Sequence, residues 1–334
     1  MNEIQDEPIL DVRNLVVEFD AGGGRKIHAV SDVGFRIAKG ETLGLVGESG
    51  CGKSSVARAV MQLPKPTSGW VLFCGEDLTR AEKKRLRTLR PQFQMIFQDS
   101  VSALNPRRKI GETVAVPLKI MGNGNRAERK RLVLEMLESV GVGPEAFDRL
   151  PFEFSGGQCQ RIQIARALMS NPKLLICDEP VSALDVSVQA QIINLLEDLR
   201  KRLGLTLLFI SHDLAVVKNV CDRVAVMYLG KLCEIAPSED LYRSPRHPYT
   251  AALLSAIPGP DPSLPPRKVD LLSGEMPSPT DPPSGCRFRT RCPKAEDRCA
   301  GEQPVLNVIE PGHGVACHFP KSRIPIGQQS LKKQ

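Results

Sequence analysis

The stretch that decides the fold is "GLVGESGCGKSS", residues 44–55. Gly47, four further residues, and then Gly52, Lys53 and Ser54 satisfy the pattern G-x-x-x-x-G-K-[ST]. The apolar run "TLGLVG" ends at Gly47 and helical spacing follows Ser54, so the loop lies between a predicted buried strand and a predicted helix. This context argues against a glycine-rich turn with a chance lysine. In such a loop the backbone N–H groups surround an anion, and the helix N-terminus adds partial positive charge.

These residues, here called the phosphate loop, predict a site for a nucleoside triphosphate. Lys53 can reach the β- and γ-phosphates, and the hydroxyl of Ser54 can ligate Mg²⁺. The loop residues expected to contact the nucleotide are Gly47, Glu48, Ser49, Gly50, Cys51, Gly52, Lys53, Ser54 and Ser55.

A second polar motif, "LLICDEP", ends a predicted buried strand with two adjacent carboxylates, Asp178 and Glu179. Asp178 is predicted to hold Mg²⁺ through water, and Glu179 to polarise a water aimed at the γ-phosphate. The alternative, a carboxylate pair that only caps a strand end, is weakened by the phosphate loop upstream.

Hydrophobic periodicity from about residue 9 to 235 predicts an α/β domain. "LDVRNLVVEF" alternates like a half-buried strand, whereas "TLGLVG", "LLICD" and "TLLFIS" are typical of buried parallel strands. Residues 156–170 and 186–203 repeat apolar side chains at helical spacing. Residues from about 110 to 150 lack strand signals and predict several short helices inserted in the α/β core.

The bulk composition is that of a globular protein kept in the cytoplasm. The 334 residues are 41% hydrophobic and 25% charged, and the acidic N-terminus "MNEIQDEPILDVRN" is unlike a signal peptide. No run approaches the roughly 18 apolar residues that a membrane helix needs. The net charge of +7 suits phosphates or an anionic membrane surface, although a solvated basic face, including the run at residues 80–91, is the preferred interpretation.

Composition changes after Ile257, where a segment rich in Pro, Gly and Ser predicts irregular structure that something else must hold in place. Four of the ten cysteines follow, at Cys286, Cys292, Cys299 and Cys317, and the other six are predicted to be small buried hydrophobes. The wide spacing lacks the tight pair of a zinc knuckle and suits a 4Fe–4S cluster as a structural staple. Zinc, unoccupied thiols and disulfides stay open as alternatives.

The side chains around these cysteines allow two interpretations each. Arg287, Arg289 and Arg291 either offset the negative charge of a cluster or face water. His313 and His318 are expected to be surface histidines rather than further ligands.

The motif "FSGGQCQR" then makes a family recognisable. Ser155, Gly156, Gly157 and Gln158 stand at a predicted helix start, about a hundred residues after the phosphate loop, and resemble the signature of ATP-binding cassette (ABC) ATPases. Phe154 replaces the usual leucine. The resemblance covers residues 9–257 and implies an ABC-type P-loop core with an antiparallel β subdomain and a helical subdomain. It further implies that the signature acts in trans, on ATP bound by an opposing subunit.

The same resemblance assigns further roles. Gln98 in "MIFQDS" looks like the Q-loop, Asp185 in "SALD" like the D-loop, and His212 in "FISHD" like the switch histidine. Phe19 is placed like the aromatic residue that stacks on adenine, with core packing as the equal alternative. The implied catalytic residues are Glu179, His212 and Lys53, and Mg²⁺ would be held through Ser54, Gln98 and Asp178. The implied domains are a cassette over 8–257, with its helical and signature region at about 98–170, and an extension over 258–334.

Three features resemble the oligopeptide/dipeptide importers: "HPYTAALLSAIPGP" from His247, "LNP" at 104–106, and the cysteine tail. "VSALDVSVQAQIINLL" leans toward the F-type of the two paired ATPases. The resemblance implies a peripheral subunit on the cytoplasmic side of the inner membrane that powers di- or oligopeptide import. Its implied partners are a second ATPase in a heterodimer, two transmembrane permeases and, indirectly, an external solute-binding protein.

The rival functions have less support. Nickel, glutathione or another small solute could be the cargo of the same machinery. A non-transport cassette acting on nucleic acid or ribosomes usually has two cassettes or long coiled coils, and this sequence has one cassette and no sustained heptads, so no nucleic-acid partner is expected. A catalytically idle cassette is disfavoured by Glu179, His212 and the intact phosphate loop.

Overall fold

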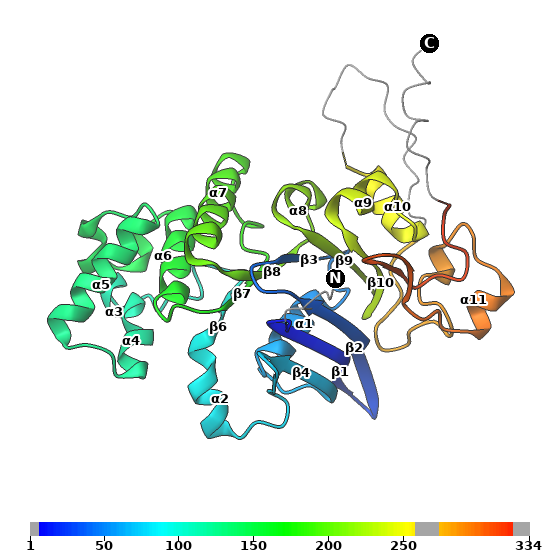
Figure 1. The fold of residues 1–334 in the computed structure, drawn as a ribbon, viewed down its shortest axis with the longest axis horizontal. Coiled ribbons are helices and arrows are strands. Elements are labelled where there is room, and N and C mark those ends of the chain that lie inside the picture. Colours follow the sequence, from blue (N-terminus) through cyan, green and yellow to red (C-terminus); the bar gives the residue numbers. More distant parts are fainter. Residues whose placement is uncertain (1–6, 258–273, 323–334) are drawn as a thin grey trace, which may run out of the picture.

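The structure, a computed structural model, describes residues 7–257 and 274–322 of the chain. Figure 1 shows a central sheet with a helical region at one end and the described part of the C-terminal extension, residues 274–322, at the other. Among the described residues, no helix combines the length and the apolar character needed to cross a bilayer.

The larger sheet has the strand order β11-β12-β10-β9-β3-β8-β7-β6. Strands β3, β6, β7, β8 and β9 pair in parallel, while β10, β11 and β12 add antiparallel strands at one edge. Every residue of β3, β7 and β8 is buried, as predicted for the three apolar runs. The strands are β3 (Thr42–Val46), β6 (Phe93–Ile96), β7 (Leu174–Asp178), β8 (Thr206–Ser211), β9 (Arg223–Tyr228), β10 (Lys231–Pro237), β11 (Asn307–Glu310) and β12 (His313–Val315).

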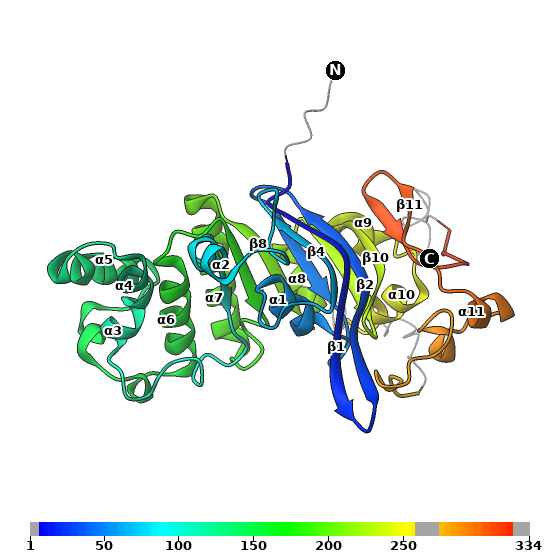
Figure 2. The same cartoon turned by 90° about the horizontal axis from the view of Figure 1, so that it is seen from below.

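A second, antiparallel sheet has the order β2-β1-β4-β5. Its long β1–β2 hairpin projects from the body of the molecule (Figure 2). Together the two sheets give the expected α/β core with an antiparallel β subdomain. The strands are β1 (Leu10–Gly22), β2 (Arg25–Ile37), β4 (Ser68–Phe73) and β5 (Glu76–Asp77).

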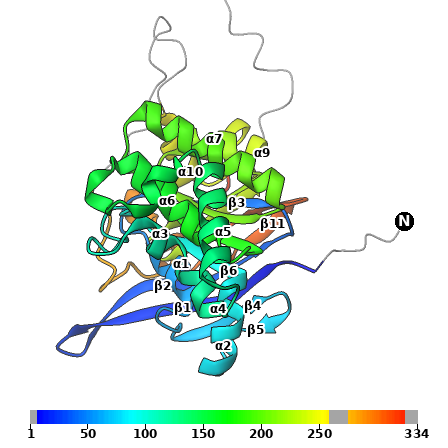
Figure 3. The same ribbon diagram turned by 90° about the vertical axis from the view of Figure 1, so that its left-hand side faces the viewer.

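Helices cover the larger sheet and build the helical region. The insertion expected between residues 110 and 150 folds into α3, α4 and α5, which gather beside α6 (Figure 3). The basic run at 80–91 forms α2, which buries only Leu86 and Leu89 and exposes most of its charges. The helices are α1 (Lys53–Val60), α2 (Lys83–Leu89), α3 (Ile110–Val114), α4 (Val116–Met121), α5 (Arg126–Ser139), α6 (Gly156–Leu168), α7 (Val186–Leu203), α8 (Leu214–Val220), α9 (Ser238–Arg243), α10 (Pro248–Ser255) and α11 (Asp297–Gly301).

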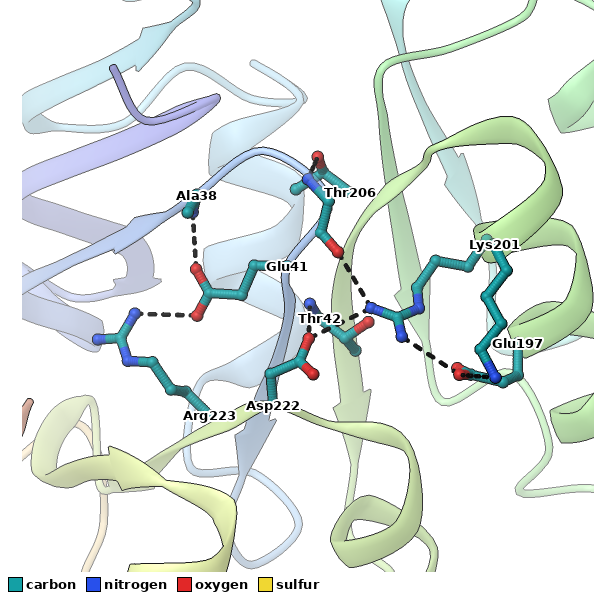
Figure 4. Close-up of polar contacts among 10 residues, drawn as sticks. Ala38, Glu41, Thr42, Glu197, Lys201, Thr206, Asp222 and Arg223 are labelled. Carbon is teal, nitrogen blue, oxygen red and sulfur yellow. Dashed lines mark hydrogen bonds and ion pairs between the residues drawn. The ribbon is translucent and has the colours of Figure 1, made fainter. Parts of the chain in front are cut away.

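A polar network ties the start of β3 to its neighbours (Figure 4). Asp222, just before β9, accepts from the backbone N–H of Thr42 at 2.8 Å and from the guanidinium of Arg200 at 3.3 Å. Arg200 also donates to the carbonyl of Gly40 at 3.0 Å. The network therefore holds α7, β9 and the start of β3 together, at the opposite end of β3 from the phosphate loop.

The extension is more regular than its composition predicts. Its hairpin β11–β12 joins the larger sheet because β12 pairs with β10, with Val315 opposite Glu234. Residues 258–273 of the Pro-rich segment lie outside the described residues, and 274–285 contain no helix or strand.

Two expectations about which side chains are buried are wrong. His313 is 3% exposed rather than on the surface, because its Nε2 lies 2.7 Å from the fully buried carboxylate of Glu234. Cys74 is exposed, whereas the other five scattered cysteines are buried as predicted.

Candidate nucleotide site

At two positions of the phosphate loop, any residue other than glycine would clash with a neighbouring backbone carbonyl. Gly47 has φ 152° and a Cβ there would lie 2.1 Å from the carbonyl oxygen of Met227. Gly52 has φ 107° and a Cβ there would lie 2.2 Å from the carbonyl oxygen of Ala29. The pattern seen in the sequence is therefore dictated by close approach of β9 and β2 to the loop.

Lys53 begins α1 and is 4% exposed. Its Nζ donates to the carbonyls of Gly47 at 2.8 Å and Glu48 at 3.0 Å, so the ammonium is held against the backbone at the start of the phosphate loop. Buried Cys51 packs beneath, with its Sγ 3.9 Å from Nζ.

A cavity of about 280 Å³ lies over the loop. Phe19 of β1 is 37% exposed and stands on its wall, a position that fits stacking on a base better than core packing. Sequence reasoning missed Pro279 of the extension, which also lines the cavity. The lining residues are Phe19, Ile27, Ala29, Ser49, Gly50, Gly52, Lys53, Ser54, Ser55, Gln98, Glu179 and Pro279.

The predicted metal and catalytic side chains meet beside this cavity. Ser54 Oγ donates to Asp178 Oδ1 at 2.9 Å, joining the end of β7 to the start of α1. Burial raises the pKa of Asp178, while the hydrogen bond from Ser54 opposes that shift. Gln98 Nε2 donates to Glu179 Oε2 at 2.9 Å. Hydroxyl, carboxylate and amide oxygens on one face are the donors that Mg²⁺ prefers.

His212, after β8, joins the same group. Its Nδ1 lies 3.3 Å from Glu179 Oε2, and its side chain is 55% exposed. Glu179 itself has φ 48°, a left-handed conformation that is uncommon for a non-glycine residue and recurs at functional sites.

The signature lies apart from this cavity. Ser155 caps α6: its Oγ accepts from the N–H of Gln158 at 3.3 Å, and Gln158 Oε1 accepts from the N–H of Ser155 at 3.0 Å. A Cβ at Gly157 would lie 2.6 Å from a methyl of Val188 in α7, so the helices pack closely there. Neither the signature, including Gly156, nor Asp185 at the N-cap of α7 lines the cavity. The helix tip is thus capped and is not part of the cavity over the chain's own phosphate loop.

Comparison with known proteins agrees with this arrangement. Residues 30–182 match the family model "ABC transporter", and residues 233–299 match "Oligopeptide/dipeptide transporter, C-terminal region". YkfD of Bacillus subtilis is 53% identical over 93% of this chain and 95% of its own length. The chain belongs to the ABC transporter family. OppF of Haemophilus influenzae, an oligopeptide transport ATP-binding protein, is 50% identical over 93% of this chain and 97% of its own.

Solved ABC cassettes share the fold. The cassette MJ0796, in a dimeric post-hydrolysis state bound to ADP and Pi, superposes with a TM-score of 0.64 at 28% identity, over 69% of this chain and 98% of its own. This ABC ATPase is accordingly an enzyme that binds and hydrolyses ATP with Mg²⁺. The resemblance stated from the sequence, including its oligopeptide/dipeptide subfamily, is confirmed.

In residues 7–257 and 274–322, no group of three or more His, Cys, Asp or Glu side chains is placed to hold a metal ion. The four cysteines of the extension are among the residues to which this applies. Burial raises the pKa of Cys317 to about 11; the hydrogen bond from the backbone N–H of Phe319 opposes this shift, and Cys286, Cys292 and Cys299 add smaller increases. All four thiols are free, so the disulfide alternative is not realised.

The arginines among these cysteines differ from one another. Arg289 donates to the carbonyl of Ser284 at 2.9 Å within its own loop. Arg291 is buried and pairs with Glu48 of the phosphate loop at 2.6 Å, a partner neither sequence interpretation included. No sequence pattern could have found this pair, because 243 positions separate its members.

Proposed function

We propose that this ABC ATPase powers the import of di- or oligopeptides and does so as one of two paired cassettes. The proposal rests on two contact groups beside the phosphate loop, Ser54–Asp178 and Gln98–Glu179–His212, and on a signature that does not line the same cavity. The peptide cargo is supported by the C-terminal family match and by relatives named for oligopeptide transport.

The proposed roles follow from position. Lys53 and the loop N–H groups bind the phosphates, and Phe19 receives the base. Ser54, Gln98 and Asp178 would hold Mg²⁺, which neutralises charge between the β- and γ-phosphates. Glu179 would take a proton from the attacking water. His212 would orient Glu179 through Nδ1, and its side chain would also contact the γ-phosphate.

The signature would complete the site of a partner. With Ser155 and Gln158 capping α6, the helix N-terminus offers N–H groups and partial positive charge to an anion from outside the chain. ATP would join two cassettes face to face and hydrolysis would release them. We assign the partner as a second, homologous ATPase, with this chain as the F-type member, because the named relatives are OppF proteins.

That cycle would drive two membrane permeases that receive peptide from an external solute-binding protein, with this chain peripheral on the cytoplasmic face. In domain terms, residues 8–257 would be the cassette, with about 98–170 its helical and signature region, and 258–334 its extension.

The test is ATP-dependent uptake of labelled peptides into vesicles carrying the chain with the permeases and second ATPase encoded beside it. We expect uptake that stops when Lys53→Ala replaces the natural chain. Uptake of nickel or glutathione in place of peptides would reassign the cargo, and ATPase activity stimulated by nucleic acid or ribosomes but by no permease would contradict transport.

We further propose that Cys286, Cys292, Cys299 and Cys317 hold a 4Fe–4S cluster as a staple of the extension. The thiols as placed do not form a site for a single ion such as zinc, so the proposal rests on donor chemistry: four free cysteines in one extension supply the ligand number and type of a 4Fe–4S cluster. The expected result is a brown anaerobic preparation whose iron and acid-labile sulfide disappear in Cys292→Ser/Cys299→Ser. A colourless preparation from the natural sequence would contradict it.

A further inference from the structure

The extension touches the phosphate loop through a partly buried ion pair. Arg291, with its side chain 7% exposed, donates from one terminal nitrogen to Glu48 Oε2 at 2.6 Å and from the other to Glu48 Oε1 at 3.1 Å. Glu48 is the residue directly after Gly47. A fork of two parallel hydrogen bonds fixes the direction of the carboxylate as well as its distance.

A second contact reaches the same residue through an aromatic group. The backbone N–H of Glu48 donates to the hydroxyl of Tyr249 in α10 at 3.0 Å. The Tyr249 ring packs against Tyr228, with centroids 4.8 Å apart, and against Phe288 of the extension, 5.3 Å apart. The guanidinium of Arg291 lies 5.8 Å from the Tyr228 centroid. The backbone and the side chain of Glu48 are therefore both held from the C-terminal side.

The extension also reaches the nucleotide cavity directly. Pro279 lines it, and the Pro279 carbonyl accepts from the N–H of His28 in β2 at 2.9 Å. Met276 lies next to the loop, with its Cε 3.5 Å from where a Cβ on Gly50 would stand. The segment thus contacts both β2 beside the cavity and the phosphate loop.

We propose that residues 276–291 of the extension form part of the ATP site, with Arg291 as the positioning residue that orients the phosphate loop through Glu48. An anion cradle binds well only when its N–H groups are already aimed inward. Arg291 both fixes the loop at Glu48 and neutralises a carboxylate next to the incoming phosphates. Without Arg291 that negative charge would stand uncompensated beside the anion site.

The experiment measures the Kd for Mg-ATP, by fluorescence of a labelled ATP, on the full-length chain. We expect Arg291→Ala to weaken binding about tenfold, since charge-assisted hydrogen bonds are lost at an anion site. Arg291→Lys, which keeps the charge but loses the fork, should weaken it by about threefold. The matched control is Arg298→Ala, which removes an exposed arginine of the extension whose partner is Glu302 and should leave the Kd unchanged.

The double variant Glu48→Arg/Arg291→Glu exchanges the two charges of the ion pair. It distinguishes a loss of loop positioning from a loss of folding. We expect each single change to weaken ATP binding and the double variant to restore the Kd to within about threefold of the natural chain. In the assembled ATPase the KM for ATP should follow the Kd while kcat stays nearly constant.

The outcomes are distinct. A folded Arg291→Ala that binds ATP as tightly as Arg298→Ala would overturn the proposal. Should Arg291→Ala unfold, an unchanged Kd in Arg291→Lys would do the same. Lys53→Ala identifies a different failure: if it too binds normally, the nucleotide site itself is misassigned and the function proposed above fails with it.

Discussion

At the residue scale, the chemistry centres on Glu179. One oxygen, Oε2, accepts from Gln98 at 2.9 Å and lies 3.3 Å from His212 Nδ1, and the side chain is 13% exposed. Both contacts are made to Oε2, and Glu179 lines the cavity over the phosphate loop. The geometry suits a general base held by two neighbours.

Glu179→Gln should therefore reduce ATP hydrolysis about 10²–10⁴-fold, because the amide keeps the shape but cannot take the proton of water. ATP binding should persist and an ATP-bound dimer should accumulate. The measurement is steady-state turnover together with native mass. Glu239→Gln, on the exposed side of α9, is the control, and normal turnover in Glu179→Gln would remove Glu179 from catalysis.

His247 gives a pH dependence. Its buried ring caps α10 by accepting from the N–H of Tyr249 at 3.0 Å, and burial lowers its pKa to about 4, against a smaller opposing effect from the charge of Glu234. As the pH falls below about 6.5 the unfolded chain takes up a proton that the folded chain refuses until about pH 4. Stability contributed by this group is thus complete above pH 6.5 and is lost as the pH falls.

The free energy of unfolding should drop by about 2 kcal/mol between pH 7 and pH 5 on account of this residue. Denaturant titration of the natural chain and of His247→Asn, which keeps a capping acceptor, measures it. The slope with pH should be shallower in His247→Asn, and identical slopes would show that His247 does not titrate as described.

The sequence predicts contacts within the site well where the residues are close together in the chain, and poorly where they are far apart. Gly47, Gly52, Lys53 and Ser54 are adjacent, so one motif predicts their joint role, and the apolar strand before Asp178 predicts its place at the sheet edge. Arg291 could not be predicted to meet Glu48, since only the folded path of the extension brings them together.

At the element scale, the entry to β3 depends on Asp222, the centre of the network in Figure 4. Asp222→Ala should lower the free energy of unfolding by about 1–3 kcal/mol, because the N–H of Thr42 and the guanidinium of Arg200 lose their acceptor. Asp222→Asn keeps an acceptor oxygen and should cost less than half as much. Equal losses in both variants, measured by urea titration, would count against the hydrogen-bond account.

Elements with strong periodicity were predictable and short ones were not. The apolar spacing of 186–203 predicts a helix over the residues that form α7, and the buried runs predict β3, β7 and β8. The hairpin β11–β12 has strands of four and three residues, one of them largely exposed, so no alternation could reveal it. The hairpin is stabilised because β12 pairs with β10. This pairing joins segments far apart in the sequence, so local sequence patterns could not predict it.

At the scale of the whole molecule, the phosphate loop and the signature lie in different parts of the fold. The Ser155 tip is away from the cavity that Lys53 and Glu179 line. If a second cassette supplies the signature, as proposed above, Ser155→Arg should abolish hydrolysis while leaving ATP binding by the same chain intact.

The most direct test of this account is the ATPase rate per chain, measured with the partner ATPase over a dilution series in which native mass gives the fraction of paired cassettes. The account predicts that the rate per chain falls in proportion to the paired fraction and vanishes when all chains are single. A full rate per chain in samples that contain only single cassettes would contradict it.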